Sequence, residues 1–114
     1  MISVADGSGQ VTPDDRFWLL ATELLTRPEV SRSTMMGLPC LRVEGRFFAS
    51  LDPRTGCLLV KLSREEVQAL IDLGDGLPFA PAGRRFREWV AIPSEHHSAW
   101  RTYLERALAF VGTT

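Results

Sequence analysis

Between residues 35 and 62, hydrophobic residues alternate with polar residues or form short runs, a pattern that predicts consecutive antiparallel strands. Two turn signals divide this stretch. Glu44-Gly45 separates two strand-like runs, and Gly45 can adopt the positive φ that a tight hairpin needs. Pro53 and Gly56 mark a second turn before the run CLLVKL. We therefore expect a meander of strands in the middle of the chain.

Apolar residues at helical spacing flank this meander and predict three helices. Thr12 is a suitable N-cap for a helix that should end before Pro28. Ser63, followed three residues later by Glu66, has the pattern of a capping box, and Ser94 is expected to cap the last helix. The expected buried positions are Phe17, Leu20, Ala21, Leu24 and Leu25 in the first helix, Val67, Leu70 and Ile71 in the second, and Trp100, Tyr103, Leu104, Ala107, Leu108 and Val111 in the third.

Two further strands are predicted outside the meander, a polar edge strand over Glu29–Thr34 and a short strand over Trp89–Ile92. Asp75–Arg87 contains two prolines and two glycines and should be an irregular connection. This order of elements predicts an α+β two-layer sandwich, an antiparallel sheet with its helices packed on one face. We expect a flexible tail over residues 1–11 and a single domain over residues 12–114.

Composition excludes several classes of function. The net charge is −1, so no global positive field attracts nucleic acid or membranes, and any such binding must use a local patch. The sequence has no apolar leader or membrane-length segment, so we expect a cytoplasmic protein with no membrane partner. No phosphate loop, GxSxG element or Ser-His-Asp pattern is present, which argues against an enzyme.

Metal and thiol chemistry are also not expected. Cys40 and Cys57 form no CxxC motif and lie in predicted strands, where they should be small buried hydrophobic residues. His96-His97 are adjacent and diverge on a helix, whereas a helical zinc pair needs i, i+4 spacing. Asp14 and Asp15 at the first helix start are explained by the helix dipole. We therefore predict no cofactor and no metal site.

Four segments carry a resemblance to a known family: GLPCLRVEGRFFA (residues 37–49), CLLVKL (57–62), PFAPA (78–82) and EWVAIP (88–93). In order and spacing they resemble the YjbR/MmcQ family, and the first half is also similar to the N-terminal domain of TfoX-type competence regulators. The resemblance implies a frataxin-like, or CyaY-like, fold, and members of the family are commonly labelled DNA-binding. The chain departs from the family at residues 82–88, where AGRRFRE replaces a Gly-rich segment.

We accordingly expect a non-catalytic binding protein, with DNA as the preferred ligand. The candidate residues for nucleic-acid binding are Arg42, Arg46, Lys61, Arg84, Arg85, Arg87 and Trp89. Strand alternation places Arg42 and Lys61 together on the sheet face away from the helices, while Phe47 and Phe48 can face either side. A solvated charged face explains the same cations without any ligand.

A second hypothesis is a protein-interaction module that uses the sheet face away from the helices. Apolar residues occupy both faces of the strand Cys57–Leu62, so something must cover the second face. A protein partner or a homodimer could provide that cover. The connection from Leu77 to Phe86 could equally provide it, and the sequence does not distinguish these alternatives.

Overall fold

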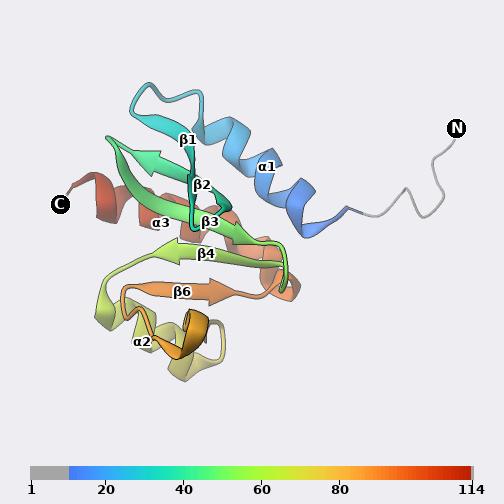
Figure 1. The fold of residues 1–114 in the computed structure, drawn as a ribbon, viewed down its shortest axis with the longest axis vertical. Coiled ribbons are helices and arrows are strands. Elements are labelled where there is room, and N and C mark those ends of the chain that lie inside the picture. The colour runs from blue at the N-terminus through green and yellow to red at the C-terminus, as the bar shows by residue number, and fades with distance from the viewer. Residues whose placement is uncertain (1–10, 114) are drawn as a thin grey trace, which may run out of the picture.

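Six strands form one antiparallel sheet within residues 11–113, the part of the chain that this computed structural model describes (Figure 1). The strands are β1 (Val30–Met35), β2 (Leu38–Val43), β3 (Arg46–Asp52), β4 (Cys57–Lys61), β5 (Leu77–Pro78) and β6 (Trp89–Ile92). Their spatial order is β1-β2-β3-β4-β6-β5, so the meander is followed by a crossover that places the last strand beside β4. The predicted flexible tail lies outside the described residues, except for Val11, which is exposed.

Three helices among the described residues pack on one face of this sheet, which confirms the predicted α+β two-layer sandwich (Figure 1). They are α1 (Pro13–Leu24), α2 (Arg64–Leu73) and α3 (Trp100–Gly112). None of these described helices is long and apolar enough to cross a bilayer. The core between sheet and helices includes Phe17 from α1, Val67 from α2 and Trp100 from α3, all nearly or fully buried.

Local capping explains where the first two helices begin. Thr12 and Asp15 form a reciprocal capping box, with backbone-to-side-chain hydrogen bonds of 3.0 and 3.1 Å. Ser63 caps α2 by accepting a 3.2 Å hydrogen bond from the backbone N–H of Glu66. The Glu66 carboxylate does not complete the predicted box, because it pairs instead with Arg106 of α3 at 2.9 Å.

The β2–β3 hairpin determines which phenylalanine faces the core. Glu44 and Gly45 have φ values of 52° and 82°, so two residues make the turn and Val43 pairs with Arg46. Arg42 then pairs with Phe47, whereas Leu41 pairs with Ala49, so the ladder contains a bulge at Phe48. Phe48 consequently lies in the main core at 0% exposure, and Phe47 lies on the opposite sheet face.

The second sheet face carries a smaller apolar cluster that the chain itself covers. Leu59, Trp89 and Ala91 lie on this face and pack with Phe79, and Phe86 packs against the same cluster. Phe79 and Phe86 both belong to the segment between α2 and β6. The Leu77–Phe86 connection therefore covers part of this face, which is one of the alternatives that the sequence left open.

Two sequence predictions are wrong in detail. Ser94 does not cap the last α-helix; it begins a 3-10 helix (Ser94–Ala99) that breaks at His96, and α3 starts only at Trp100. The indole N–H of Trp100 donates to the carbonyl of Pro93 at 3.3 Å, which ties α3 to the end of β6. The connection over residues 75–87 also contains regular structure, since Leu77–Pro78 pairs with β6 and Pro81–Gly83 forms a 3-10 turn.

Candidate nucleic-acid interface

Three neighbouring hollows lie along the end of the sheet where β3 and β6 begin and β4 ends. The first and second hollows share Lys61, Glu88 and Trp89, and the second and third share Arg64 and Arg87. Together we call these hollows the basic groove, because five cations line them, with two acids, Glu65 and Glu88. The cations are Arg46, Lys61, Arg64, Arg85 and Arg87.

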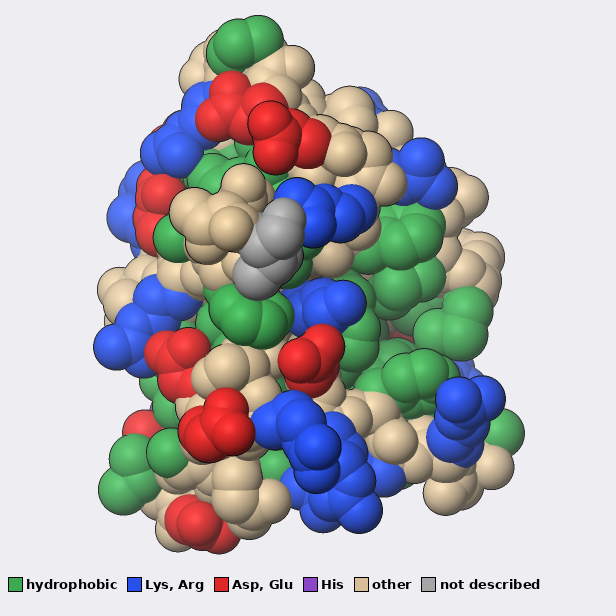
Figure 2. Space-filling model, turned by 90° about the vertical axis from the view of Figure 1, so that its left-hand side faces the viewer, with side chains coloured by type: hydrophobic (Ala, Val, Ile, Leu, Met, Phe, Trp, Pro, Cys, Tyr) green, Lys and Arg blue, Asp and Glu red, His purple; other side chains and the backbone are tan. Residues whose placement is uncertain are grey.

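Figure 2 shows this side of the molecule, the one at the left of Figure 1 where α3 ends and β4 leads into α2. Lys and Arg side chains recur down the middle of the view and gather most densely in its lower part. An acidic side chain interrupts them, and hydrophobic side chains flank them on the right. Positive charge is therefore concentrated locally, although the chain as a whole has a net charge of −1.

Residues at the ends of strands line the first hollow, which forms the upper part of the groove. Arg46 follows the β2–β3 turn directly, and Lys61 is the last residue of β4, where it pairs in register with Trp89. The Lys61 ammonium lies 3.8 Å from the Glu88 carboxylate, an ion pair too long for a hydrogen bond. Glu88 is fixed through its backbone, since its carbonyl accepts a 3.0 Å hydrogen bond from the N–H of Leu62.

The lower part of the groove depends on α2 and on the segment before β6. Arg64 is the first residue of α2, and Arg87 lies two residues before β6. Arg85 donates a 3.1 Å hydrogen bond to the side chain of Gln68 on α2. Within residues 11–113, no salt bridge engages Arg64, Arg85 or Arg87. These exposed guanidinium groups are thus available to an anionic ligand.

The structure brings together four of the seven predicted residues as cations of the groove, namely Arg46, Lys61, Arg85 and Arg87, and Trp89 lines it. Trp89 is only 9% exposed, so most of its ring belongs to the second apolar cluster. Arg42 does not line the hollows, but its guanidinium lies 4.4 Å from the centroid of the Phe47 ring, which lines the first one. Arg84 lies 5.3 Å from the centroid of Phe86 and does not line the hollows that form the groove.

Arg64 lines the groove but is not among the residues that the sequence predicted for nucleic-acid binding. It follows Lys61 by three positions at a strand-to-helix junction. That proximity to Lys61 was the available signal, because a short junction keeps both side chains at the same end of the sheet. Its contact with the Arg87 region depends on the crossover that places β6 beside β4, which no local pattern reveals.

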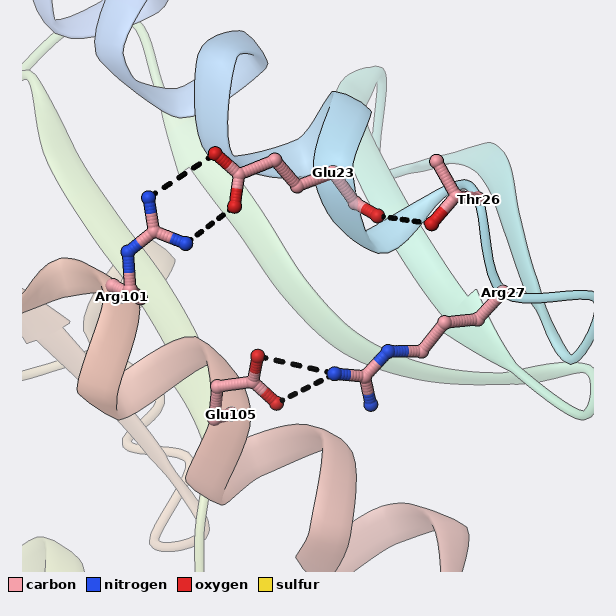
Figure 3. A network of polar contacts seen from close by, with 5 residues as sticks. All are labelled: Glu23, Thr26, Arg27, Arg101 and Glu105. Atoms are coloured by element: carbon pink, nitrogen blue, oxygen red, sulfur yellow. Dashed lines mark hydrogen bonds and ion pairs between the residues drawn. The ribbon is translucent and has the colours of Figure 1, made fainter.

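A second charged cluster joins α1 to α3 and is internally paired (Figure 3). Arg101 binds Glu23 with both guanidinium nitrogens, and Arg27 lies 3.1 Å from Glu105. The hydrogen bond from Arg101 lowers the pKa of Glu23 below its ordinary value and raises that of Arg101. A hollow of about 190 Å³ lies between these pairs, but their mutual neutralisation makes this cluster an interhelical contact rather than an anion site.

Other chemistry finds no support in the described residues. Among residues 11–113, no group of three or more His, Cys, Asp or Glu side chains is placed to hold a metal ion. Both cysteines are buried, as predicted, and burial raises the pKa of the Cys40 thiol despite the opposing effects of Arg42 and Ser33. The His97 ring lies 3.0 Å from the guanidinium of Arg16, a contact that occupies its Nδ1.

Comparisons with family models, with curated proteins and with solved structures find no match to this chain. The resemblance to the YjbR/MmcQ family therefore stays a prediction that rests on the sequence segments alone.

Proposed function

We propose that this protein is a non-catalytic nucleic-acid-binding protein whose basic groove holds the phosphates of the ligand. The observation that supports this proposal is that three neighbouring hollows, which share lining residues, are lined by five cations and two acids. Such an arrangement favours the binding of a polyanion, because each phosphate that a cation neutralises releases condensed counterions. Arginine, which contributes four of the five cations, can contact a phosphate through two parallel N–H donors.

The extended form of the groove favours a polymer over a single small anion. Its cations come from β3, β4, α2 and the segment before β6, so they follow one another along the sheet end. Aromatic side chains lie beside this path, since Phe47 lines the first hollow and Phe86 the second. Both rings are half-buried, and they offer bases an apolar surface next to the phosphate contacts.

The alternative is a protein-interaction module that uses the second sheet face, but the chain itself covers part of that face. Phe79 and Phe86 cover the apolar residues of β4 and β6 on the second sheet face. Trp18 of α1, another aromatic residue that could anchor a protein partner, is half-buried and has the guanidinium of Arg32 at 4.3 Å from its ring centroid. We therefore keep nucleic acid as the proposed ligand.

The test is fluorescence anisotropy with labelled single-stranded and duplex DNA at several salt concentrations. If all five cations contact phosphates, the logarithm of the affinity should fall against log salt with a slope of about −3.5 for a single strand and about −4.5 for a duplex. The double variant Arg64→Ala/Arg87→Ala should reduce the single-strand slope to about −2.1. Neither side chain is buried, so the fold should persist.

The double variant Arg16→Ala/Arg54→Ala is the matched control. It changes the net charge from −1 to −3, as the groove variant does, but Arg54 follows β3 at its far end, and α1, which carries Arg16, begins beside that turn. The control should bind like the wild type. Absence of binding at low salt overturns the proposal, and so does an equal loss of affinity in both double variants, because the binding would then not be local.

A further inference from the structure

The first hollow of the basic groove combines an aromatic lining with charges of both signs. It has a volume of about 490 Å³, within the range of about 300–1,000 Å³ that is typical of small-molecule sites. Phe47, Trp89 and Phe110 provide the aromatic part of its lining, and Arg46, Lys61 and Glu88 provide the charges. A uniformly positive hollow would suit phosphate alone. This mixture suits a ligand unit that also has a flat apolar ring and hydrogen-bond donors.

The aromatic residues of the hollow are held in place by the fold. Phe47 packs against the second apolar cluster and has the Arg42 guanidinium 4.4 Å from its ring centroid. Trp89 is fixed in the same cluster and in register with Lys61. Because these rings are already ordered, a base that stacks on the exposed part of Phe47 meets a surface that needs no rearrangement.

Glu88 is the unusual member of this hollow, because a carboxylate repels phosphate. Its side chain is 45% exposed, and its nearest cationic partner, Lys61, is 3.8 Å away. An ionised carboxylate can only accept hydrogen bonds, through two oxygens side by side. Guanine is the one common base whose Watson–Crick edge presents two adjacent donors, N1–H and N2–H; the other bases present an acceptor beside each donor. Glu88 therefore has the chemistry to select guanine.

We propose that this hollow binds one unpaired guanine of a single-stranded nucleic acid. The ring of the base lies against Phe47, Glu88 accepts hydrogen bonds from N1–H and N2–H, and Arg46 and Lys61 contact the adjoining phosphates. The inference rests on the proposed function, since the rest of the strand follows the basic groove. It adds a base preference that phosphate contacts cannot provide.

The test compares two labelled single strands, an all-thymine oligonucleotide and the same oligonucleotide with one central guanine. The guanine strand should bind about tenfold more tightly, as expected for one good bidentate contact to a base. Replacing that guanine by adenine should abolish the gain, and replacing it by inosine, which lacks the N2 amino group, should remove most of it. Free GMP is titrated separately; if it binds as tightly as the guanine strand, a free nucleotide rather than a strand is the ligand, and the inference is overturned.

Glu88→Gln tests the role assigned to the carboxylate. The variant should lose the preference for guanine while it binds the all-thymine strand at least as well as the wild type, because a negative charge has left the groove. Glu95→Gln is the matched control, since Glu95 is exposed and follows the end of β6 opposite the groove, and it should keep the preference. Circular dichroism melts verify that both variants fold.

The outcomes separate this inference from the proposed function. If no oligonucleotide binds at low salt, the proposed function fails and this inference fails with it. If every strand binds with the same affinity, the groove still binds nucleic acid, but the guanine site is refuted. If Glu88→Gln keeps the guanine preference, the assignment of Glu88 is wrong.

Discussion

Replacing Phe47 or Phe48 by Ala should have opposite consequences for stability and for ligand binding, because the two rings lie on opposite faces of β3. Phe48 is fully buried in the main core beneath the helices. Phe47 is half-buried, packs against the smaller cluster and lines the first hollow of the basic groove. The residues are identical in type and adjacent in sequence, so each is a control for the other.

The expected magnitudes differ enough to measure. Truncation of a fully buried phenylalanine costs about 3–5 kcal/mol, a large share of the about 5–15 kcal/mol that stabilises a typical domain. Phe47→Ala should cost about 1 kcal/mol, below the about 1.5–3 kcal/mol gained by burying such a ring completely. Loss of the Phe47 ring as a stacking surface should instead weaken single-strand binding by about 1–3 kcal/mol. In the middle of that range, the affinity falls by more than tenfold.

Urea unfolding followed by circular dichroism measures the first quantity, and anisotropy with a labelled single strand measures the second. Because Phe48→Ala can leave too little stability to fold, Phe48→Leu is included as a milder change in the same place. Phe48→Leu should lower the urea midpoint and leave the affinity unchanged. Phe47→Ala should lower the affinity and cost only about 1 kcal/mol of stability.

Two results would refute this reasoning. If Phe47→Ala destabilises the protein as much as Phe48→Ala, the bulge in β3 does not place the rings as described. If Phe48→Leu lowers the affinity and Phe47→Ala does not, the first hollow is not where bases bind.

Three further predictions concern stability and are each tested by unfolding measurements. Gly76→Ala would place a Cβ 2.6 Å from Cγ2 of Val90 and should cost about 1–3 kcal/mol in urea unfolding, with less than additive loss when Val90→Ala is added. Ser63→Ala removes the α2 cap and should cost about 1 kcal/mol in the same assay; no loss would show that the hydrogen bond to Glu66 is not used. Because the pKa of Glu23 is lowered in the folded state, its contribution is complete above the ordinary glutamate pKa and is lost as pH falls through the lowered value. The melting temperatures of wild type and Glu23→Gln should therefore differ at neutral pH and converge in acid, and a gap that widens in acid would contradict the sign.

Local signals predicted much of the fold. The caps at Thr12 and Ser63 set the starts of α1 and α2 within one residue. Helical spacing also placed Phe17, Val67 and Trp100 in the main core. These predictions succeed because each depends on neighbours in the sequence, where backbone geometry and side-chain spacing are fixed together.

Predictions failed where distant segments decide the conformation. Ser94 has the residue type of a cap, but the hydrogen bond from Trp100 to Pro93 and the burial of Trp100 under the sheet favour a 3-10 segment before α3. The faces of Phe47 and Phe48 depended on the two-residue turn before them and on the bulge at Phe48. The groove was only partly predictable for the same reason, since the approach of Arg64 to Arg87 requires β6 to lie beside β4.

The near-neutral charge of the chain does not argue against a local anion site, because most paired carboxylates lie elsewhere. Of the five salt bridges among residues 11–113, only Lys61–Glu88 lies in the basic groove. The others engage acids between α1 and α3, between α2 and α3, and at the β3–β4 turn. At physiological ionic strength, exposed charges are screened beyond about 8 Å, so an acid at the opposite end of the sheet, such as Asp52 at the end of β3, contributes little to the field at the groove. Under the proposed function, we therefore expect the salt dependence of the affinity to report the number of cations in the groove rather than the net charge of the protein.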